Sequence, residues 1–305
     1  MFDKKSFYDK LVEKFPGINI KIDELMKKHT SFQIGGPADI LILPKNKDEL
    51  KAVLVECSKD NITPYIIGNG TNLLVMDNGV RGVIIKIGNN FNNIEVCGNV
   101  IVAHAGVALV TLSYLAMERG LTGLEFAGGI PGSVGGAVYM NAGAYGGEMR
   151  DVVTSAEVMN FNGDEVILDN SELQFGYRKS LLQNGNLIAT KIKIQLKEGN
   201  YEEIRKRMDE LNHLRKKKQP LVLPSAGSTF KRPDGYYAGE LIEKAGLKGF
   251  RVRDAQVSEL HAGFIVNLGE ATAKDVIELI NCIKKKIKEQ YNVELLPEVK
   301  ILGEE

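Results

Sequence analysis

The sequence predicts an α+β protein with two domains, and three observations support this. The 305 residues are about twice the length of a typical domain. Helical periodicity alternates with short apolar runs typical of strands. Several of these runs are joined by Gly-Asn or Asn-Gly pairs, which are typical of antiparallel hairpins. We expect residues 1–200 to form the first domain, in two lobes of roughly 1–90 and 91–200, and residues 201–305 to form a C-terminal α/β domain.

The first lobe is expected to begin with an amphipathic helix. Phe7, Leu11 and Phe15 recur on one helical face, and Pro16-Gly17 ends the helix. A strand, a helix and a second strand should follow, and this β-α-β order allows a parallel strand pair. The expected ranges are 39–44, 46–61 and 64–68.

The second lobe is expected to be rich in antiparallel strands. After a strand at 82–87, one hairpin turns at Gly98-Asn99 and another at Asn162-Gly163. Between them lies a helix at 108–120, with Gly120 as its C-cap. A long strand is expected at 186–196.

The C-terminal domain is expected to open with a charged helix at 201–218, whose inner side carries Ile204, Met208 and Leu211. Thr272 and Asp275 form a capping pair at the start of a later helix. The remaining expected elements are a helix at 238–245, a strand at 261–267, that capped helix at 273–290 and a final strand around 293–302.

Composition excludes several functional classes. Thirty-nine basic residues balance thirty-nine acidic ones, which disfavours a nucleic-acid or anionic-membrane binder. No apolar run approaches the roughly 18 residues of a membrane span, and the N-terminus lacks the apolar region of a secretory signal. The three cysteines form no CxxC pair and indicate reduced thiols in a cytoplasmic protein. The four histidines lack metal-ligand spacing, so no metal site is expected.

Glycine points to a bound cofactor. Many of the 32 glycines crowd into residues 68–82 and 120–147, where they would let the backbone approach a ligand closely. The common nucleotide motifs do not match: there is no Gly-Lys pair, and Leu73 occupies the third glycine position of a dinucleotide fingerprint. Successive amides in GNGTNLLV (68–75) and GGIPGSVGG (128–136) could instead cradle a diphosphate. Each segment taken alone could also be a tight turn, whereas the presence of two such segments favours a binding site for a long dinucleotide.

Six motifs in order resemble one family of flavoenzymes. They are SFQIGGPAD (31–39), IIGNGTNLLV (66–75), GLEFAGGIPGSVGGAVYMNAGAYGGE (123–148), FGYRKS (175–180), PSAGSTFKRP (224–233) and LLPEVKILG (295–303). From about residue 20 to the C-terminus the chain resembles the UDP-N-acetylenolpyruvoylglucosamine reductases, in their short form. Their cofactor domain is the FAD-binding domain of the vanillyl-alcohol-oxidase type, which is not a Rossmann fold.

This resemblance implies an oxidoreductase of peptidoglycan precursor synthesis, a process of cell wall biogenesis. NADPH would be the co-substrate, FAD a non-covalent cofactor, and the enolpyruvyl group of a UDP-sugar the group reduced to UDP-N-acetylmuramate. It assigns the cofactor site to residues of both glycine-rich segments. These are Tyr65, Ile67, Gly68, Asn69, Gly70, Thr71, Asn72, Leu74, Gly128, Gly129, Ile130, Pro131, Ser133, Gly135 and Gly136.

The resemblance also assigns three catalytic residues. Arg178 would stabilise the enolate that forms next to the substrate carboxylate, and Ser228 would donate the proton. Glu298 would act as a protonated acid or orient a water, with its apolar neighbours raising its pKa. The substrate contacts by motif position are Tyr145, Lys218, Lys231 and Arg232. Relatives often carry asparagine at Arg232 and serine at Thr71.

Other interpretations remain open on the residues alone. Arg178, Ser228 and Glu298 could each be an ordinary turn or strand residue. A carbon-oxidising flavoprotein on the same scaffold would lack these three residues and often attaches its flavin to a histidine, and neither glycine-rich segment contains one. A UDP-sugar-binding protein without flavin would not need the intact segments. The sequence specifies no oligomeric state.

Overall fold

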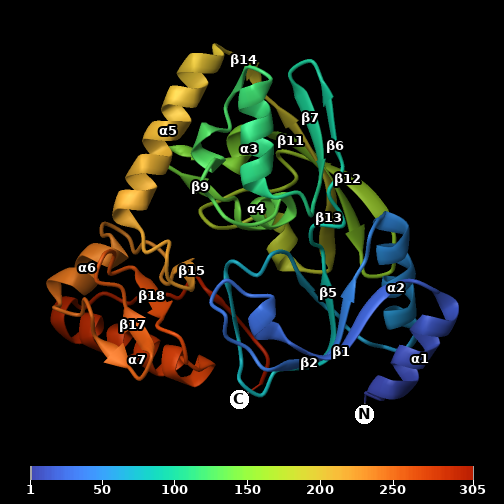
Figure 1. Ribbon diagram of the computed structural model, residues 1–305, viewed down its shortest axis with the longest axis horizontal. Helices are drawn as coiled ribbons and strands as arrows, with labels where there is room; N and C mark the ends of the chain where they lie inside the picture. The colour runs from blue at the N-terminus through green and yellow to red at the C-terminus, as the bar shows by residue number, and fades with distance from the viewer. Residues whose placement is uncertain (1, 305) are drawn as a thin grey trace. The chain divides into compact units, whose positions relative to one another are not determined.

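The computed structural model describes residues 2–304, which fold as two compact units of mixed helices and strands (Figure 1). Unit 1 comprises residues 2–22, Ile40–Asn69 and Gly82–Leu214. Unit 2 comprises Asp23–Asp39, Gly70–Arg81 and residues 215–304. The α+β class is confirmed. The expected domain boundary after residue 200 stays a prediction; by contacts, two early segments of the chain belong with the C-terminal part.

A four-stranded sheet has the order β1-β2-β5-β3; β3 lies wholly in unit 1, and β1, β2 and β5 lie there for most of their length. Its strand β3 lies parallel to β5, with Ile67 opposite Lys86. The parallel arrangement was expected between the strands that flank α2, but β5 is inserted between them. The strand bounds are β1 (Asn19–Leu25), β2 (Pro37–Leu43), β3 (Tyr65–Ile67) and β5 (Val80–Lys86). Strand β1 was not predicted from the sequence.

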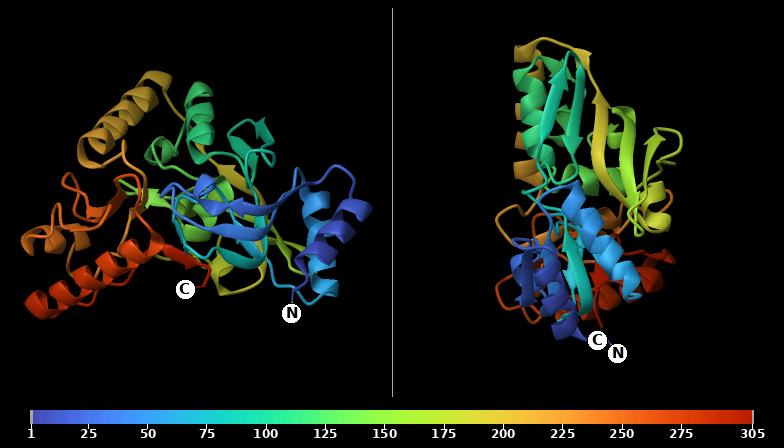
Figure 2. Two further views of the ribbon diagram at one scale, coloured as in Figure 1. Left: turned by 60° about the horizontal axis from the view of Figure 1, so that its bottom comes forward. Right: turned by 90° about the vertical axis from the view of Figure 1, so that its right-hand side faces the viewer.

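Helices α1 (Lys4–Lys14) and α2 (Lys47–Lys59) lie side by side in unit 1 (Figures 1 and 2). A buried carboxylate joins them: Glu56 of α2 forms ion pairs with Lys14 Nζ at 2.7 Å and Lys10 Nζ at 3.0 Å, both from α1. Lys59 Nζ of its own helix lies at 2.7 Å. Hydrogen bonds from Lys14 and Lys59 lower the pKa of Glu56 from 4.5 to about 2, so this cluster favours the ionised carboxylate over most of the pH range.

The second part of unit 1 is an antiparallel sheet in the order β12-β11-β13-β7-β6. Both predicted hairpins and the long strand are confirmed, since β6 pairs with β7 and β11 with β12 and β13. The expected helix is α3 (Leu109–Glu118), followed by Gly120 at φ +65°. The strand bounds are β6 (Ile94–Cys97), β7 (Val100–His104), β11 (Val153–Asn160), β12 (Glu165–Asp169) and β13 (Leu187–Gln195).

Helix α4 (Val134–Met140) packs on β13 and β7 of this sheet (Figure 1) and was not predicted. Its two glycines lower helix propensity by about 1 kcal/mol each relative to alanine. Tertiary contacts compensate for this, because Val134, Ala137 and Val138 are buried in the core of unit 1. Short strand pairs complete the unit, with bounds β8 (Leu121–Thr122), β9 (Gly143–Ala144), β10 (Gly147–Glu148) and β14 (Lys197–Glu198).

Unit 2 contains a sheet in the order β15-β18-β17-β16 with α6 and α7 in the same core. The predicted helices are confirmed as α5 (Tyr201–Lys218), which begins in unit 1, α6 (Ala238–Lys244) and α7 (Ala273–Tyr291). The expected strand at 261–267 is shorter, and strands β15 to β17 were missed. The strand bounds are β15 (Ser225–Ser228), β16 (Arg251–Val252), β17 (Ala255–Val257) and β18 (Phe264–Asn267).

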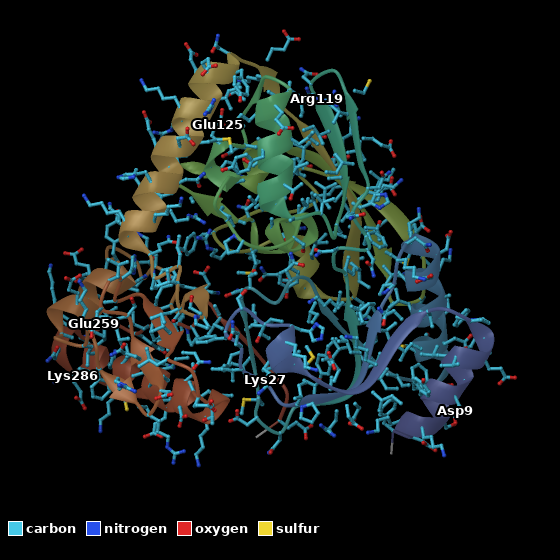
Figure 3. All side chains as sticks on the ribbon, in the orientation of Figure 1. Asp9, Lys27, Arg119, Glu125, Glu259 and Lys286 are labelled. Carbon is cyan, nitrogen blue, oxygen red and sulfur yellow. The ribbon has the colours of Figure 1, made fainter. Side chains whose placement is uncertain are left out.

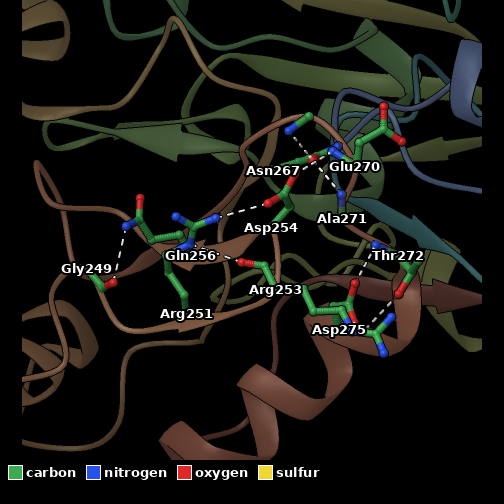
Figure 4. A network of polar contacts seen from close by, with 11 residues as sticks. Gly249, Arg251, Arg253, Asp254, Gln256, Asn267, Glu270, Ala271, Thr272 and Asp275 are labelled. Carbon is green, nitrogen blue, oxygen red and sulfur yellow. Dashed lines mark hydrogen bonds and ion pairs between the residues drawn. The ribbon is translucent and has the colours of Figure 1, made fainter.

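The start of α7 ties an early segment of the chain into unit 2. Thr272 and Asp275 form the predicted capping box (Figure 4). Asp77 adds a second cap, because its carboxylate accepts the backbone N–H groups of Ala273 at 2.8 Å and Lys274 at 3.0 Å. A carboxylate at this position also interacts favourably with the helix dipole. The loop after β4 (Leu73–Val75) is therefore held by α7, far away in the sequence.

The expected final strand around 293–302 is wrong over most of its length. Only β19 (Lys300–Leu302) is regular, and it pairs parallel to β4. Before it, Pro297 forms an isolated bridge with Phe230. Proline has no N–H to donate, which suits a single bridge better than a continuous ladder.

No helix within residues 2–304 is both long enough and apolar enough to cross a membrane.

Candidate functional site: two glycine-rich segments and three catalytic candidates

The first glycine-rich segment follows β3 and makes a close backbone contact at Gly70. This residue has φ +67°, and a Cβ there would lie 2.1 Å from the carbonyl oxygen of His29. The N–H of Ser31 donates to the Gly70 carbonyl at 3.1 Å. Both the left-handed backbone and the lack of space require glycine at this position. The segment 29–31 thereby determines the shape of the loop at 70–72.

The second glycine-rich segment is hydrogen-bonded to residues 105–109, which connect the end of β7 to the start of α3. Val134 and Gly135 donate N–H bonds to Val107 and Ala105, and the Leu109 N–H donates to Gly132. Ser133 is the N-cap of α4 and accepts the Gly136 N–H at 3.3 Å. Upstream, Glu125, labelled in Figure 3, closes the turn before the segment by accepting bonds from Thr122 and Gly123.

The two segments meet within unit 1. A Cβ on Gly68 would lie 2.6 Å from Ser133 Oγ, so the backbone at 68 passes directly against that hydroxyl. Gly68 and Gly136 are both half-buried and lie against the same hydroxyl group. Closely spaced amides with no side chains in the way are the surroundings that a diphosphate accepts. These residues therefore fit a dinucleotide such as FAD, as the sequence predicted.

The predicted cofactor residues differ in how much of each is exposed to solvent. Tyr65 is 45% exposed, and Pro131 is also exposed. Ile67 is buried, and Leu74 is fully buried in the core of unit 2. Leu74 can thus offer a ligand only its backbone. The residues that are neither exposed nor buried are Gly68, Asn69, Thr71, Asn72, Gly129, Ile130, Gly135 and Gly136, while Gly70, Gly128 and Ser133 are buried.

Arg178 lies in a tight turn of unit 1 and has a left-handed backbone at φ +54°. Gly176 and Lys179 close the turn by exchanging N–H···O bonds of 2.9 and 3.1 Å. The guanidinium donates to the Gly143 carbonyl at 3.3 Å and lies 5.3 Å from the Tyr177 ring centre. Arg178 is therefore half-buried and oriented by its contacts.

Tyr145 lies on the hairpin that Arg178 contacts. It occupies the two-residue turn between β9 and β10 with φ +54°, followed by Gly146 at φ +91°. Two positive φ values are typical of a type I′ turn. Gly143, the Arg178 acceptor, starts this hairpin, so the structure brings these two predicted site residues onto neighbouring turns. Tyr145 is 40% exposed.

Asn141 is a residue that the sequence analysis missed. It ends α4 with a left-handed backbone at φ +42° and is almost fully buried. Its amide donates to Glu148 Oε2 and to the Gly176 carbonyl, both at 3.0 Å, and its oxygen accepts the Arg150 N–H at 2.9 Å. An Asn at the end of a helix is itself a left-handed capping signal, although its partners could not be read from the sequence.

Ser228 and Glu298 lie on adjoining backbone segments of unit 2. The N–H of Glu298 donates to the carbonyl of Thr229 at 2.8 Å, and Lys231 donates to Leu296 at 2.9 Å. Ser228 Oγ donates to the Phe230 carbonyl at 3.2 Å. Both residues are half-buried. Two catalytic candidates 70 positions apart are thus placed by one short backbone ladder.

The first glycine-rich segment also reaches this ladder. Asn72 Nδ2 donates to the Glu298 carbonyl at 3.2 Å, and the Asn72 carbonyl accepts the Lys300 N–H at 3.0 Å. Three sequence-distant segments, around residues 72, 228 and 298, therefore meet in unit 2.

The surroundings of Glu298 differ from the sequence expectation. Leu295 and Val299 are buried in the core, but Leu296 is 55% exposed. The apolar sequence neighbours therefore alternate between core and solvent and do not together enclose the carboxyl group.

The remaining predicted substrate contacts also lie in unit 2. Lys218 is exposed at the last residue of α5, and Lys231 is half-buried beside the Ser228 ladder. Arg232 is exposed, and its Cζ lies 4.1 Å from the Tyr237 ring centre, a cation–π distance.

His261 is a second residue that the sequence analysis missed. Its Nδ1 accepts the Gly263 N–H at 3.1 Å, and the Gly263 carbonyl accepts the Thr229 N–H at 2.8 Å. Its ring contacts Phe264, the register partner of Ser228, with centres 5.0 Å apart. Burial lowers the pKa of His261, and the charge of Lys248 acts in the same direction. The neutral ring thus supports the turn that holds the Ser228 strand.

Comparisons with known proteins agree with this arrangement. Residues 38–169 match the FAD-binding domain family, and residues 219–302 match the C-terminal domain of UDP-N-acetylenolpyruvoylglucosamine reductase. The reductase of that name from Caldanaerobacter subterraneus is 53% identical over 97% of this chain and 98% of its own length. The one from Alkaliphilus oremlandii is 51% identical over 99% and 100%, respectively.

A solved structure shows the same fold. The crystal structure of UDP-N-acetylenolpyruvylglucosamine reductase from Thermus caldophilus matches with a TM-score of 0.80 and 39% identity, covering 94% of this chain and 99% of that one. The matches confirm the expectation of an FAD-binding domain followed by a C-terminal domain of the reductase type. This chain belongs to the UDP-N-acetylenolpyruvoylglucosamine reductase family.

Proposed function

We propose that this protein reduces the enolpyruvyl group of UDP-N-acetylglucosamine enolpyruvate to give UDP-N-acetylmuramate, with NADPH as the electron donor and FAD as the cofactor. The observation that carries the proposal is the meeting of three segments in unit 2: the Asn72 loop, the Ser228 strand and the backbone of Glu298. Family membership supports the same reaction. The proposed setting is peptidoglycan precursor synthesis in the cytoplasm, with no nucleic acid or membrane as partner.

The residues proposed to hold FAD are those of the two glycine-rich segments. When bound, FAD supplies the hydride chemistry that links NADPH to the enolpyruvyl group. Gly68 and Gly136 keep bulky side chains away from the backbone beside the Ser133 hydroxyl, and Gly70 lets the first segment pack against the His29 carbonyl. Ser133 orders the start of α4 beside Gly68. Thr71 offers a hydroxyl where relatives often carry serine, so the donor is kept.

Arg178 is proposed to stabilise negative charge on the substrate. Addition of hydride to an enol-ether carboxylate drives charge onto the carboxylate, as an enolate. A guanidinium can donate two parallel hydrogen bonds to such a group. Because Arg178 is already oriented by Gly143, it would not have to reorganise during the reaction, and a preorganised donor of this kind is typically worth about 3 kcal/mol.

Ser228 is proposed to protonate the adjacent carbon, and Glu298 to assist as a neutral acid or through a water. A serine hydroxyl is a weak acid, so it must deliver its proton to a basic carbon from a well-positioned start. The Phe230 carbonyl and the backbone ladder give Ser228 that position. Tyr145, Lys218, Lys231 and Arg232 are proposed to contact the UDP-sugar, with Lys218 serving as a point charge for the diphosphate.

The proposal is tested by purifying the protein and examining its cofactor and reaction. We expect a yellow protein that releases FAD on denaturation. Beyond the amount that reduces the bound FAD once, NADPH should be oxidised only when the enolpyruvyl UDP-sugar is added, and mass spectrometry should show a product two mass units heavier than the substrate. A colourless protein that takes up no FAD, or a flavoprotein that leaves this substrate unchanged, would contradict the proposal.

A further inference from the structure

We propose that Asn141 and Gln183 are positioning residues that hold the Arg178 guanidinium in its working orientation, and so determine how fast the enolpyruvyl group is reduced. The inference rests on the proposed function and adds two residues to it. It stands on a set of hydrogen bonds that lies entirely within unit 1.

The Arg178 turn has a conformation that needs outside support. A left-handed backbone is unfavourable for an arginine, because its Cβ approaches the following carbonyl oxygen. Arg178 nevertheless has φ +54°, and the turn that contains it spans only Gly176 to Lys179. Non-glycine residues keep such conformations where the surrounding structure over-determines them, often at functional sites.

That support comes from the C-terminal end of α4. Asn141 donates to the Gly176 carbonyl, which begins the turn, at 3.0 Å. Gln183 Nε2 donates to the Arg178 carbonyl at 3.0 Å and to the Tyr139 carbonyl at 2.8 Å. Ser180 Oγ also donates to Tyr139, at 2.9 Å. The Asn141 amide therefore holds the start of the turn, the Gln183 amide holds the Arg178 carbonyl, and the Ser180 hydroxyl holds the residue after the turn. All three connect the turn to the C-terminal end of α4.

The C-terminal end of α4 also positions the Gly143 carbonyl, which accepts the hydrogen bond of the Arg178 guanidinium. Gly143 follows Asn141 by two residues, and its carbonyl accepts from Arg178 Nη2. Asn141 is joined to the opposite strand of that hairpin through Glu148. Loss of the Asn141 amide would therefore release the turn that carries Arg178 and the hairpin that orients it. A displacement of about 1 Å at a catalytic group can cost about 100-fold in rate.

The test uses Asn141→Gly and Gln183→Met. Glycine accepts the φ of +42° at position 141, so the first variant removes the amide without straining the backbone. Methionine fills a volume similar to that of glutamine but donates no hydrogen bond. The matched control is Gln195→Met, which removes an amide that donates to two backbone carbonyls of unit 1, those of Asn99 and Leu196, and shares no hydrogen-bond partner with Asn141, Gln183 or Arg178.

Stopped-flow measurements should separate the two halves of the reaction. For both variants we expect the step with the enolpyruvyl UDP-sugar to slow by about 10- to 100-fold. The step with NADPH and the dissociation constant of FAD should stay within about twofold of the wild-type values. The Gln195→Met control should leave both steps unchanged. Equal slowing of both steps, no slowing, or the same selective slowing in the control would overturn the inference.

Hydrogen exchange provides a readout that does not depend on activity. In the FAD-loaded protein, peptides covering residues 174–184 should exchange faster in Asn141→Gly than in wild type. Peptides covering 128–136 should be unchanged. Unaltered exchange at 174–184 would mean that the amide does not fasten the turn. If the wild-type protein does not reduce the enolpyruvyl substrate, the proposed function fails, whereas this exchange result still decides whether Asn141 tethers the turn.

Discussion

The Arg178 turn and the Ser228 strand hold their catalytic candidates by different means. Arg178 depends on side-chain amides that fasten a strained turn to the end of α4. Ser228 depends on backbone bonds, from Thr229 to Gly263 and from Glu298 to Thr229, which form with almost any side chain. The comparison teaches that substitutions around Arg178 should affect its geometry, whereas substitutions along the Ser228 strand should affect mainly the group that is replaced.

The largest effect should follow Ser228→Ala. The backbone ladder remains, so the protein should fold and bind FAD normally. Removal of the proposed proton donor should slow the enolpyruvyl step by about 1,000-fold and leave the NADPH step nearly intact. Stopped-flow absorbance of the flavin measures both steps. Equal damage to the two steps would mean that Ser228 serves the structure.

The next effect in size should follow Arg178→Ala. Loss of the guanidinium should slow the enolpyruvyl step by about 100- to 1,000-fold, since a preorganised donor is removed. Lys179→Ala is the matched control, because it removes an exposed cation from the same turn. Normal kinetics in Arg178→Ala, or an equal loss in the Lys179 control, would remove Arg178 from the mechanism.

Gly70→Ala should test the backbone of the first glycine-rich segment. The change places a Cβ 2.1 Å from the His29 carbonyl oxygen and forces alanine into a left-handed conformation. Together we expect a loss of about 3 kcal/mol in stability, with weaker FAD binding. Gly98→Ala, at φ +57° with open space around it, should cost only about 1 kcal/mol. Thermal unfolding and FAD titration measure both variants, and similar losses would refute the close-contact argument.

The smallest effect should be a difference in acid stability: unit 2 should begin to lose stability at a higher pH than unit 1. Burial lowers the pKa of His261 below 6.5, so its contribution to unit 2 is present above pH 6.5 and is lost as the pH falls through the lowered value. Glu56 has its pKa lowered from 4.5 to about 2, so its contribution to unit 1 is lost only between about pH 4.5 and 2.

Hydrogen exchange at a series of pH values, corrected for the intrinsic rate, measures this difference. Peptides around 258–265 should lose protection at higher pH than peptides from α1 and α2. His261→Gln, which lacks a titrating ring, should abolish the early loss. Simultaneous loss in both units would contradict the assignment of these two groups.

Much of the fold could be predicted because local patterns were consistent with it. The hairpins at Gly98 and Gly163 have positive φ values, and the Thr272–Asp275 capping box was visible as a pair of residues. The failures occurred where distant contacts override propensity. Helix α4 contains two glycines and is stabilised by packing, and the segment before β19 forms one bridge at Pro297 in place of a strand.

The sequence alone determined the chemistry that is available: two glycine-rich segments without bulky side chains, and a guanidinium, a hydroxyl and a carboxyl in recognisable motifs. Tertiary structure decided which backbone groups hold them. Asn141 lies inside one of the six motifs and His261 outside all of them, but neither role is visible in the sequence, because both roles come from the carbonyl and amide groups that these residues meet across the fold. A hydrogen bond needs two partners at a set distance and angle, and the sequence names the donors without placing the acceptors.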